Sequence, residues 1–358
     1  MNQIFMIIMA VSAVIGGIDR IRGNKWGYGA KFEEGFLFLG PTALSMAGMI
    51  CLAPVLSDVL GKAVIPFYRM IGADPGMFGS LLAIDMGGYQ LAAELAEDAR
   101  IGSYAGIVVA AIFGCTVVFT IPVGMGMIAA EDRGFFARGI MLGIITMPVG
   151  LVTGGILAGL SVIECIRQNL PVFALAALLL LGLWKIPEKM IRGFCAFAKG
   201  IQWVITAGLV LGAVEYMCGI SLVKNLAPLS EAMETVSSIG IVMLGSLPAA
   251  EFLQRILRKP FLLLGKRLGM NPAGMTGLLV GMVSVIPAIA MYKDMDEKGK
   301  VVNGAFLVSA ASMLAAHAGF TLSREPELLG AMLGAKLGGG AAAFILAMLV
   351  FCADKRKQ

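Results

Sequence analysis

Apolar runs long enough to cross a lipid bilayer recur along almost the whole chain, and this feature restricts the fold more than any other. A helix needs roughly 20 mostly apolar residues to span the hydrocarbon core. Of 358 residues, 58% are hydrophobic and only 14% are charged, a composition far from that of soluble globular chains. We therefore predict an all-α polytopic membrane protein with about 9–11 transmembrane segments. The runs lie at 4–18, 35–56, 78–93, 104–128, 139–163, 171–184, 200–217, 235–250, 274–292, 301–322 and 328–352.

Several other classes of protein are disfavoured by simple features of the chain. The first run follows MNQ, without positive charge, and the basic residues come after it in DRIRGNK, so we expect a retained helix with an outside N-terminus rather than a signal peptide. Six cysteines without CxxC spacing and a single histidine indicate neither a metal site nor a disulfide framework. We expect no metal, no cofactor and no nucleic-acid partner; membrane lipid surrounds the chain, and a homo-oligomer stays open.

Two stretches about 200 residues apart resemble each other. IPFYRMIGADPGMFGSLLA at 65–83 and KPFLLLGKRLGMNPAGMTGLLV at 259–280 share Pro-Phe, Gly-x-x-Pro and Gly-Met in the same order, and the Asp-Pro at 74–75 and Asn-Pro at 271–272 are typical helix N-caps. Internal repeats are common in secondary transporters. We predict a first transmembrane repeat at 1–163, a linker helix and cytoplasmic loop at 164–199, and a second repeat at 200–358.

The basic residues suggest how the repeats lie in the membrane. Lysine and arginine clusters at 20–31, 185–199 and 255–267 and in the tail KRK should all be cytoplasmic by the positive-inside rule. This requires that one run between the first two clusters does not cross. The best candidate is 78–93, interrupted by Gly87-Gly88, and its repeat mate is 274–292, interrupted by Pro287. With both as re-entrant segments, the halves become inverted repeats, which favours alternating access, and the C-terminus is cytoplasmic.

The first re-entrant segment carries the strongest candidate for a binding site. Asp85 lies midway along it, where a carboxylate costs roughly 2.5–3.5 kcal/mol and usually faces a cavity or a partner. Gly87 and Gly88 weaken the helix and can expose backbone carbonyls. Tyr89 offers an aromatic face to a cation, and Gln90 offers an amide. Together these residues predict a site for a small ammonium ion that carries a hydroxyl group.

Lys336 provides the alternative explanation for Asp85, because it is the only lysine or arginine deep within an apolar run. A structural ion pair would explain both residues, and the two interpretations are compatible if the substrate displaces the lysine. No acid matches Asp85 in the second re-entrant segment, where Ser284 would contribute a hydroxyl instead.

The single histidine, His317, shares its run with Ser309, Ser312 and Thr321, and the repeat places it opposite Thr116 and Thr120. A lone buried histidine is typically held by hydrogen bonds, with a proton relay as the functional alternative. With Lys336, the residues His317, Thr116 and Thr120 are candidates for a counter-ion or gating role.

The chain resembles the bacterial ethanolamine-utilization permeases, most clearly in MAGMICLAPVLSDVLGKAVIPFYRMIGADPGMFGSLLAIDMGGYQLA at 46–92 and in GMNPAGMTGLLVGMVSVIPAIAMYKDMDEKGKVVNGAFLVSAASMLAAHAGF at 269–320. The resemblance implies a facilitator in the bacterial cytoplasmic membrane that admits ethanolamine for catabolism. Its amine, a somewhat weaker base than that of lysine, is mostly protonated at neutral pH.

Two other functions remain as alternatives. A proton- or sodium-coupled transporter of a related amine would use Asp85 to carry the proton or bind the ion. An intramembrane enzyme is the remote alternative, because no second mid-membrane aspartate accompanies Asp85. The loops are too short for a docking domain, which disfavours a scaffold.

Overall fold

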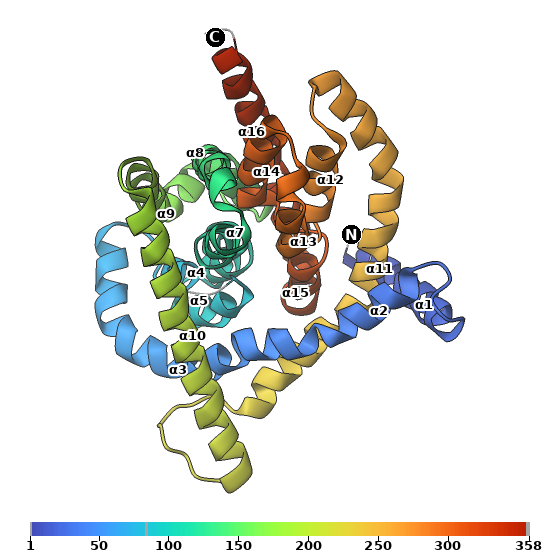
Figure 1. Ribbon diagram of the computed structural model, residues 1–358. Coiled ribbons are helices and arrows are strands. Elements are labelled where there is room, and N and C mark those ends of the chain that lie inside the picture. The colour runs from blue at the N-terminus through green and yellow to red at the C-terminus, as the bar shows by residue number, and fades with distance from the viewer. Residues whose placement is uncertain (1, 83–84, 356–358) are drawn as a thin grey trace.

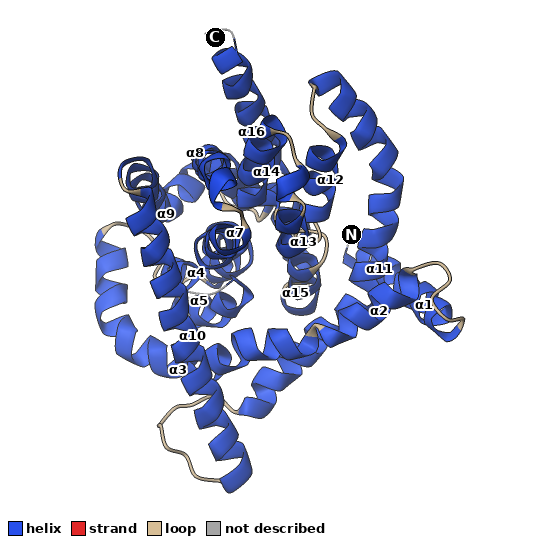
Figure 2. Ribbon diagram, in the orientation of Figure 1, coloured by secondary structure: helices blue, strands red, loops and turns tan. Residues whose placement is uncertain are grey.

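The protein is helical throughout. Its structure, a computed structural model, describes residues 2–82 and 85–355, without the side chains of Asn2, Asp85, Asp354 and Lys355. Figure 2 shows that helices joined by loops make up this part of the chain, which contains no β-strand. Eight helical segments in it are long and apolar enough to cross a membrane, carried by α1, α2–α3, α6–α7, α8, α9, α10, α11 and α16. This confirms the prediction of an all-α polytopic membrane protein.

The elements follow one another with short connections. In the first half they are α1 (Asn2–Ile21), α2 (Tyr28–Leu37), α3 (Leu39–Met70), α4 (Gly76–Leu82), the 3₁₀ turn η1 (Asp85–Gly87), α5 (Gly88–Leu95), α6 (Ala99–Tyr104), the π-helical segments η2 (Ala105–Gly114) and η3 (Thr116–Thr120), α7 (Ile121–Met127) and α8 (Arg133–Leu157). The remainder comprises α9 (Val162–Lys185), α10 (Pro187–Cys218), α11 (Leu229–Leu268), α12 (Pro272–Gly281), α13 (Val285–Ala290), α14 (Glu297–Ala310), α15 (Ala316–Arg324) and α16 (Leu329–Lys355).

The start of α9 has a clear local cause. Ser161 and Glu164 form a capping box, which satisfies the first free amides of the helix. The predicted linker helix at 171–184 is therefore the second part of a helix long enough to span a membrane. The predicted domain boundary at 163 falls in its first turn.

Three apolar runs do not form single helices but are interrupted by breaks in the helix. The first, at 76–95, consists of α4, η1 and α5, and Gly87-Gly88 lies at the junction of η1 and α5. The second breaks at 282–284, so the prediction of a break at Pro287 is wrong: Pro287 lies in the first turn of α13, where its missing N–H leaves no hydrogen bond unmade. The sequence also predicts a continuous helix at 301–322. That prediction is wrong as well, because residues 311–315 separate α14 from α15.

Two long curved helices, α3 and α11, frame the molecule (Figure 1). Each has two internal prolines at the same spacing, Pro54 and Pro66 in α3 and Pro248 and Pro260 in α11, and proline is a common cause of bending in a long helix. In Figure 1, α10 lies against α3, whereas α1 and α2 lie against α11. Each framing helix therefore packs against helices from the opposite half of the chain.

Glycines allow these contacts to be backbone to backbone. A Cβ atom on Gly48 of α3 would collide with the carbonyl oxygen of Ile205 in α10. Similarly, a Cβ atom on Gly245 of α11 would collide with the carbonyl oxygen of Met9 in α1. Small residues at helix crossings are the usual means of close packing in lipid. Inside the frame, α8, α14 and α16 pack closely against one another.

Candidate functional site

Lys336 lies in α16 at the centre of the interior and is fully buried. Its ammonium group donates to the carbonyl oxygens of Ala111 at 2.7 Å, Ala311 at 2.9 Å and Ser309 at 3.3 Å. The last carbonyls of a helix have no hydrogen-bond donor within the helix. Because α14 ends at Ala310, the carbonyl of Ser309 is one of these, and Lys336 supplies its donor. Ala111 belongs to the π-helical segment η2. The lysine thus connects α16 to an interrupted helix and a π-helix.

The break at 311–315, between α14 and α15, is held by hydrogen bonds to the break between α12 and α13. The amide of Ser312 donates to the carbonyl of Gly281 at 2.9 Å, and the amide of Leu314 donates to that of Met282 at 2.8 Å. Ser312 has a φ of 54°, a left-handed conformation that is uncommon outside glycine. Non-helical backbone at membrane depth is tolerated only in a protein interior or beside a wet cavity. The α12–α13 and α14–α15 breaks therefore meet as one buried structure.

Hydroxyl and imidazole groups surround this structure. The Thr116 hydroxyl lies 2.8 Å from the carbonyl oxygen of Val308, and Nδ1 of buried His317 lies 3.1 Å from that of Ala311, the carbonyl that Lys336 also contacts. His317 and Lys336 therefore meet at one carbonyl oxygen, and Thr116 contacts the last turns of α14 nearby. The predicted pairing of Thr116 with His317 stays a prediction.

Two hydroxyl oxygens in the same elements are buried without a hydrogen-bond partner among the described residues. They belong to Thr120, at the end of η3, and Ser309, in the last turn of α14. Buried hydroxyls nearly always have a partner in native proteins. These two oxygens are therefore available to a water molecule or a polar ligand.

Tyr89 and Gln90 of α5 contact the end of α15. The Tyr89 hydroxyl donates to Glu325 at 2.6 Å, and the Arg324 guanidinium lies 5.5 Å from the centre of the Tyr89 ring. Arg324 also donates to the side-chain oxygen of Gln90 at 3.3 Å and to Thr235 of α11 at 3.0 Å. The aromatic face predicted to meet a cation is thus next to a cation of the chain itself.

Sequence reasoning missed Arg324 and Glu325. Both residues lie just after the apolar run at 301–322. A basic residue next to an acidic residue at the end of an apolar run is the signal that could have identified them. Ser103 of α6 also donates to Glu325, at 2.9 Å, so this carboxylate joins α5, α6 and α15.

A second polar contact, also missed, joins the start of α8 to the start of α14. Lys300 donates to the Asp132 carboxylate at 2.5 Å, and the two side chains are only 13% and 9% exposed. The hydroxyl of Tyr292 donates to the carbonyl of Lys300 at 2.6 Å, and its ring meets that of Phe136 edge-on.

The remaining predicted residues are less directly placed. The side chain of Asp85 lies outside the described residues, so its pairing with Lys336 or a substrate stays a prediction. Gly87 and Gly88 are buried, and Gly87 has an ordinary right-handed conformation. Ser284 is half-buried, with extended backbone at the start of α13, next to the contact between the two breaks, and its hydroxyl makes no hydrogen bond within the described part.

The caps predicted for the two re-entrant segments are confirmed. Asp74 accepts from the amide of Gly76 at 2.7 Å, and Asn271 accepts from that of Gly274 at 2.8 Å. Nothing resembling a metal centre accompanies them, since the described residues contain no group of three potential His, Cys, Asp or Glu ligands.

A shell of spanning-length helices around broken helices with buried polar groups is the arrangement of a multi-pass membrane transport protein. The comparison with known sequences is consistent with this class. The chain belongs to the family described as "Ethanolamine utilisation protein, EutH", whose model matches residues 1–350.

Relatives match over nearly their full length. The "Probable ethanolamine permease EutH" of Listeria monocytogenes is 43% identical over 96% of this chain and 92% of its own length. The protein of the same name from Salmonella typhimurium is 38% identical over 100% and 97%, and the "Uncharacterized protein YxeR" of Bacillus subtilis is 39% identical over 100% and 97%. A permease is a transporter rather than an enzyme. No solved structure matches the chain.

Proposed function

We propose that this chain carries ethanolamine across the bacterial cytoplasmic membrane as its ammonium cation, with the N-terminus outside and the C-terminus in the cytoplasm. Membership of the EutH family and the names of the permease relatives support the substrate. The observation that carries the proposal is the environment of Lys336. Three buried backbone carbonyls, one in π-helical η2 and two at the end of α14, hold a primary alkylammonium group there, and ethanolamine bears the same group.

The proposed binding site combines a charge with hydroxyl partners. Asp85 neutralises the ammonium ion, with Gly87, Gly88, Tyr89 and Gln90 beside it on the same segment. Ser284 lies on the opposing broken helix. Thr120 and Ser309 have buried hydroxyl oxygens that can bond to the hydroxyl group of the substrate.

Two polar contacts are suited to act as latches in alternating access. Glu325, before α16, binds Tyr89 and Ser103, and Asp132, before α8, binds Lys300. In the proposed orientation, the Glu325 latch faces outside and the Asp132 latch faces the cytoplasm. Release of one latch at a time would open the interior to one side.

The inverted repeats at 1–163 and 200–358, joined by 164–199, are part of the same proposal. Their support is the reciprocal packing of α10 on α3 and of α1 on α11, with a glycine at a close backbone contact in each pair, Gly48 in α3 and Gly245 in α11. A rocking motion of one half against the other would exchange the two latched states.

Uptake of labelled ethanolamine into proteoliposomes tests this function. We expect saturable uptake that falls at least tenfold in Asp85→Asn, whereas the matched variant Asp58→Asn, at an exposed acid, keeps wild-type uptake. Unchanged uptake by folded Asp85→Asn protein would refute the cation site. Recovery of uptake when Lys336 is also replaced would assign Asp85 to a structural ion pair.

The same vesicles measure coupling and selectivity. Facilitated transport only equilibrates ethanolamine, so accumulation driven by an imposed proton or sodium gradient would show a coupled carrier instead. Competition by choline and propanolamine reports how strictly the site limits substrate size.

A further inference from the structure

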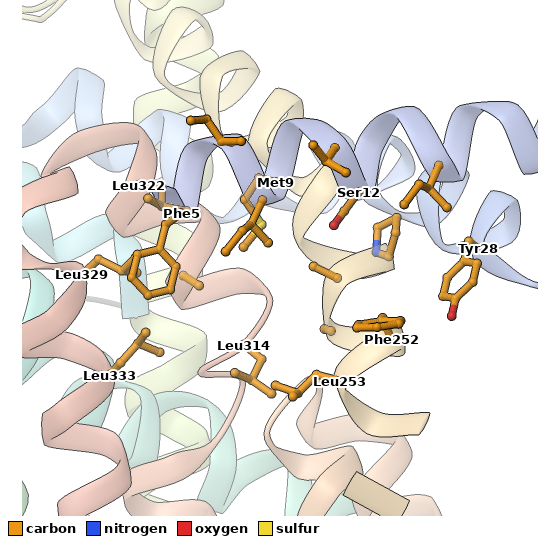
Figure 3. A pocket seen from close by; sticks show the side chains of 18 residues that line it. Phe5, Met9, Ser12, Tyr28, Phe252, Leu253, Leu314, Leu322, Leu329 and Leu333 are labelled. Carbon is orange, nitrogen blue, oxygen red and sulfur yellow. The ribbon is translucent and has the colours of Figure 1, made fainter. Parts of the chain in front are cut away.

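An elongated cleft opens between α1, α11 and the α15–α16 region, with a volume of about 620 Å³. Figure 3 shows Phe5, Met9 and Ser12 on one wall and Phe252 and Leu253 on another. Leucines from the break at 311–315, α15 and α16 close the third side, and Tyr28 lies at one end (Figure 3).

The lining excludes the proposed transport substrate. Of the lining side chains, only those of Ser12 and Tyr28 carry a polar group, and neither is charged. The stretch of α1 along the cleft, from Phe5 to Ile15, rises about 15 Å. This is about half the thickness of the hydrocarbon core, so the cleft has the length and polarity of one lipid leaflet.

The Tyr28 end is basic, in contrast with the rest of the cleft. The Arg255 guanidinium lies 4.5 Å from the centre of the Tyr28 ring and donates to the carbonyl of Trp26 at 2.8 Å. Arg22 lies 5.1 Å from the centre of the Trp26 ring. Two acids accompany these arginines. Glu251 pairs with Arg255 at 2.7 Å, and the buried Asp19 accepts from the amides of Trp26 and Gly29, both at 2.8 Å, so both carboxylates are already bound within the chain.

Two basic side chains in the loop between α1 and α2, those of Arg22 and Lys25, are available to an anion. Within the described part of the chain, neither Arg22 nor Lys25 forms an ion pair, and both are exposed. An apolar channel that ends at such a group is complementary to an amphiphile with a negatively charged head. Clusters of lysine and arginine at the cytoplasmic ends of helices commonly bind anionic headgroups.

We propose that the cleft binds an anionic phospholipid, with one acyl chain between α1 and α15–α16 and the phosphate at Arg22 and Lys25. This site is distinct from that of the proposed function and does not depend on it. Its occupant would touch Leu314, which is part of the break at 311–315, and Ala318, the neighbour of His317. The lipid would thus support the broken helix from outside.

Lipid retained by the purified protein tests the headgroup end. We expect native mass spectrometry to show one tightly held phosphatidylglycerol and much weaker retention of phosphatidylcholine with the same acyl chains. The double variant R22Q/K25Q should bind phosphatidylglycerol roughly 30-fold more weakly, or about 2 kcal/mol. The control K189Q/R192Q removes two exposed charges from another basic cluster and should bind normally. Equal retention of both lipids, or equal thermal stabilisation by inorganic phosphate, would overturn the proposal.

A second pair of variants tests the channel. Ala249→Trp fills the cleft and should abolish retention of the lipid, whereas Val210→Trp, on exposed α10, should not. Ala249→Leu adds less volume and should weaken retention by a smaller factor, which keeps the test valid if the larger residue prevents folding. If neither Ala249 variant changes retention, the proposal fails. If they instead dissociate a dimer, a second copy of the chain covers the cleft.

Discussion

Replacing Lys336 by methionine removes the buried ammonium group while it keeps most of the length and apolar stem of the side chain. The substitution changes a single group, but the hydrogen bonds of that group join separate elements through the backbone carbonyls of Ala111, Ser309 and Ala311. No other substitution in the interior tests so directly whether the helix breaks depend on a single donor.

The expected loss of stability follows from the two shorter bonds, at 2.7 Å and 2.9 Å. Leaving a buried acceptor without its donor costs about 1–3 kcal/mol. Two acceptors give about 2–6 kcal/mol. This loss is partly offset because Nδ1 of His317 stays 3.1 Å from the Ala311 oxygen and because an ammonium group no longer has to be buried. We therefore expect Lys336→Met to lower the free energy of unfolding by about 3 kcal/mol.

Thermal unfolding in detergent measures this loss, with Lys189→Met as the matched control at an exposed lysine. A loss of this size should lower the Tm by roughly 5 °C, whereas the control should change it little. A Lys336→Met protein within about 0.5 kcal/mol of the wild type would refute the reasoning, because it would show that the carbonyls find other donors.

Three further predictions concern the packing, the latches and a surface cap. Gly48→Leu should destabilise the protein by at least about 3 kcal/mol, because the larger side chain separates α10 from α3. The control Gly40→Leu, at a glycine with open space around it, should not. Equal unfolding temperatures of the two variants would contradict the close contact. With a reporter cysteine at position 284, Glu325→Gln should make that cysteine react about tenfold faster with an impermeant thiol reagent added outside. Lys300→Met should instead speed its reaction with reagent added inside. If both variants increased the reaction from the same side, the latches would be disproved. The Arg100 guanidinium holds the pKa of the Asp98 carboxyl below its ordinary value, so this group stabilises the folded state above the unfolded pKa and loses that effect as pH falls through the lowered one. Asp98→Asn should therefore unfold with less dependence on acid pH in thermal melts, and an unchanged dependence would count against the cap.

Much of the architecture could be predicted because it depends on local signals. Long apolar runs predict spanning helices, and Asp74 and Asn271 mark the starts of α4 and α12 through their side-chain caps. The repeat also placed Thr116 and Thr120 opposite His317, and this pairing stays a prediction, although Thr116 contacts Val308 of α14. The inverted orientation of the halves and the role of Asp85 stay predictions.

The parts that could not be predicted depend on tertiary contacts. The break at 311–315 has the sequence ASMLA, with neither glycine nor proline, and nothing in it opposes a helix. The break is stabilised by the carbonyls of Gly281 and Met282 and by Lys336, all distant in sequence. The π-helical segments η2 and η3 likewise have no local signature, and the partners of Glu325 lie in α5 and α6.

The reciprocal packing of the framing helices has a consequence for how the chain is made. α1 (Asn2–Ile21) leaves the ribosome long before its partner α11 (Leu229–Leu268) is synthesised. The backbone surface of α1 around Met9 therefore has no packing partner until α11 with Gly245 has been inserted. In this interval it must be covered by lipid or by the insertion machinery. α3 waits in the same way, for a shorter time, for α10. Assembly is thus completed late in translation, and the interval before α11 emerges is when the nascent protein is most exposed to misassembly and proteolysis.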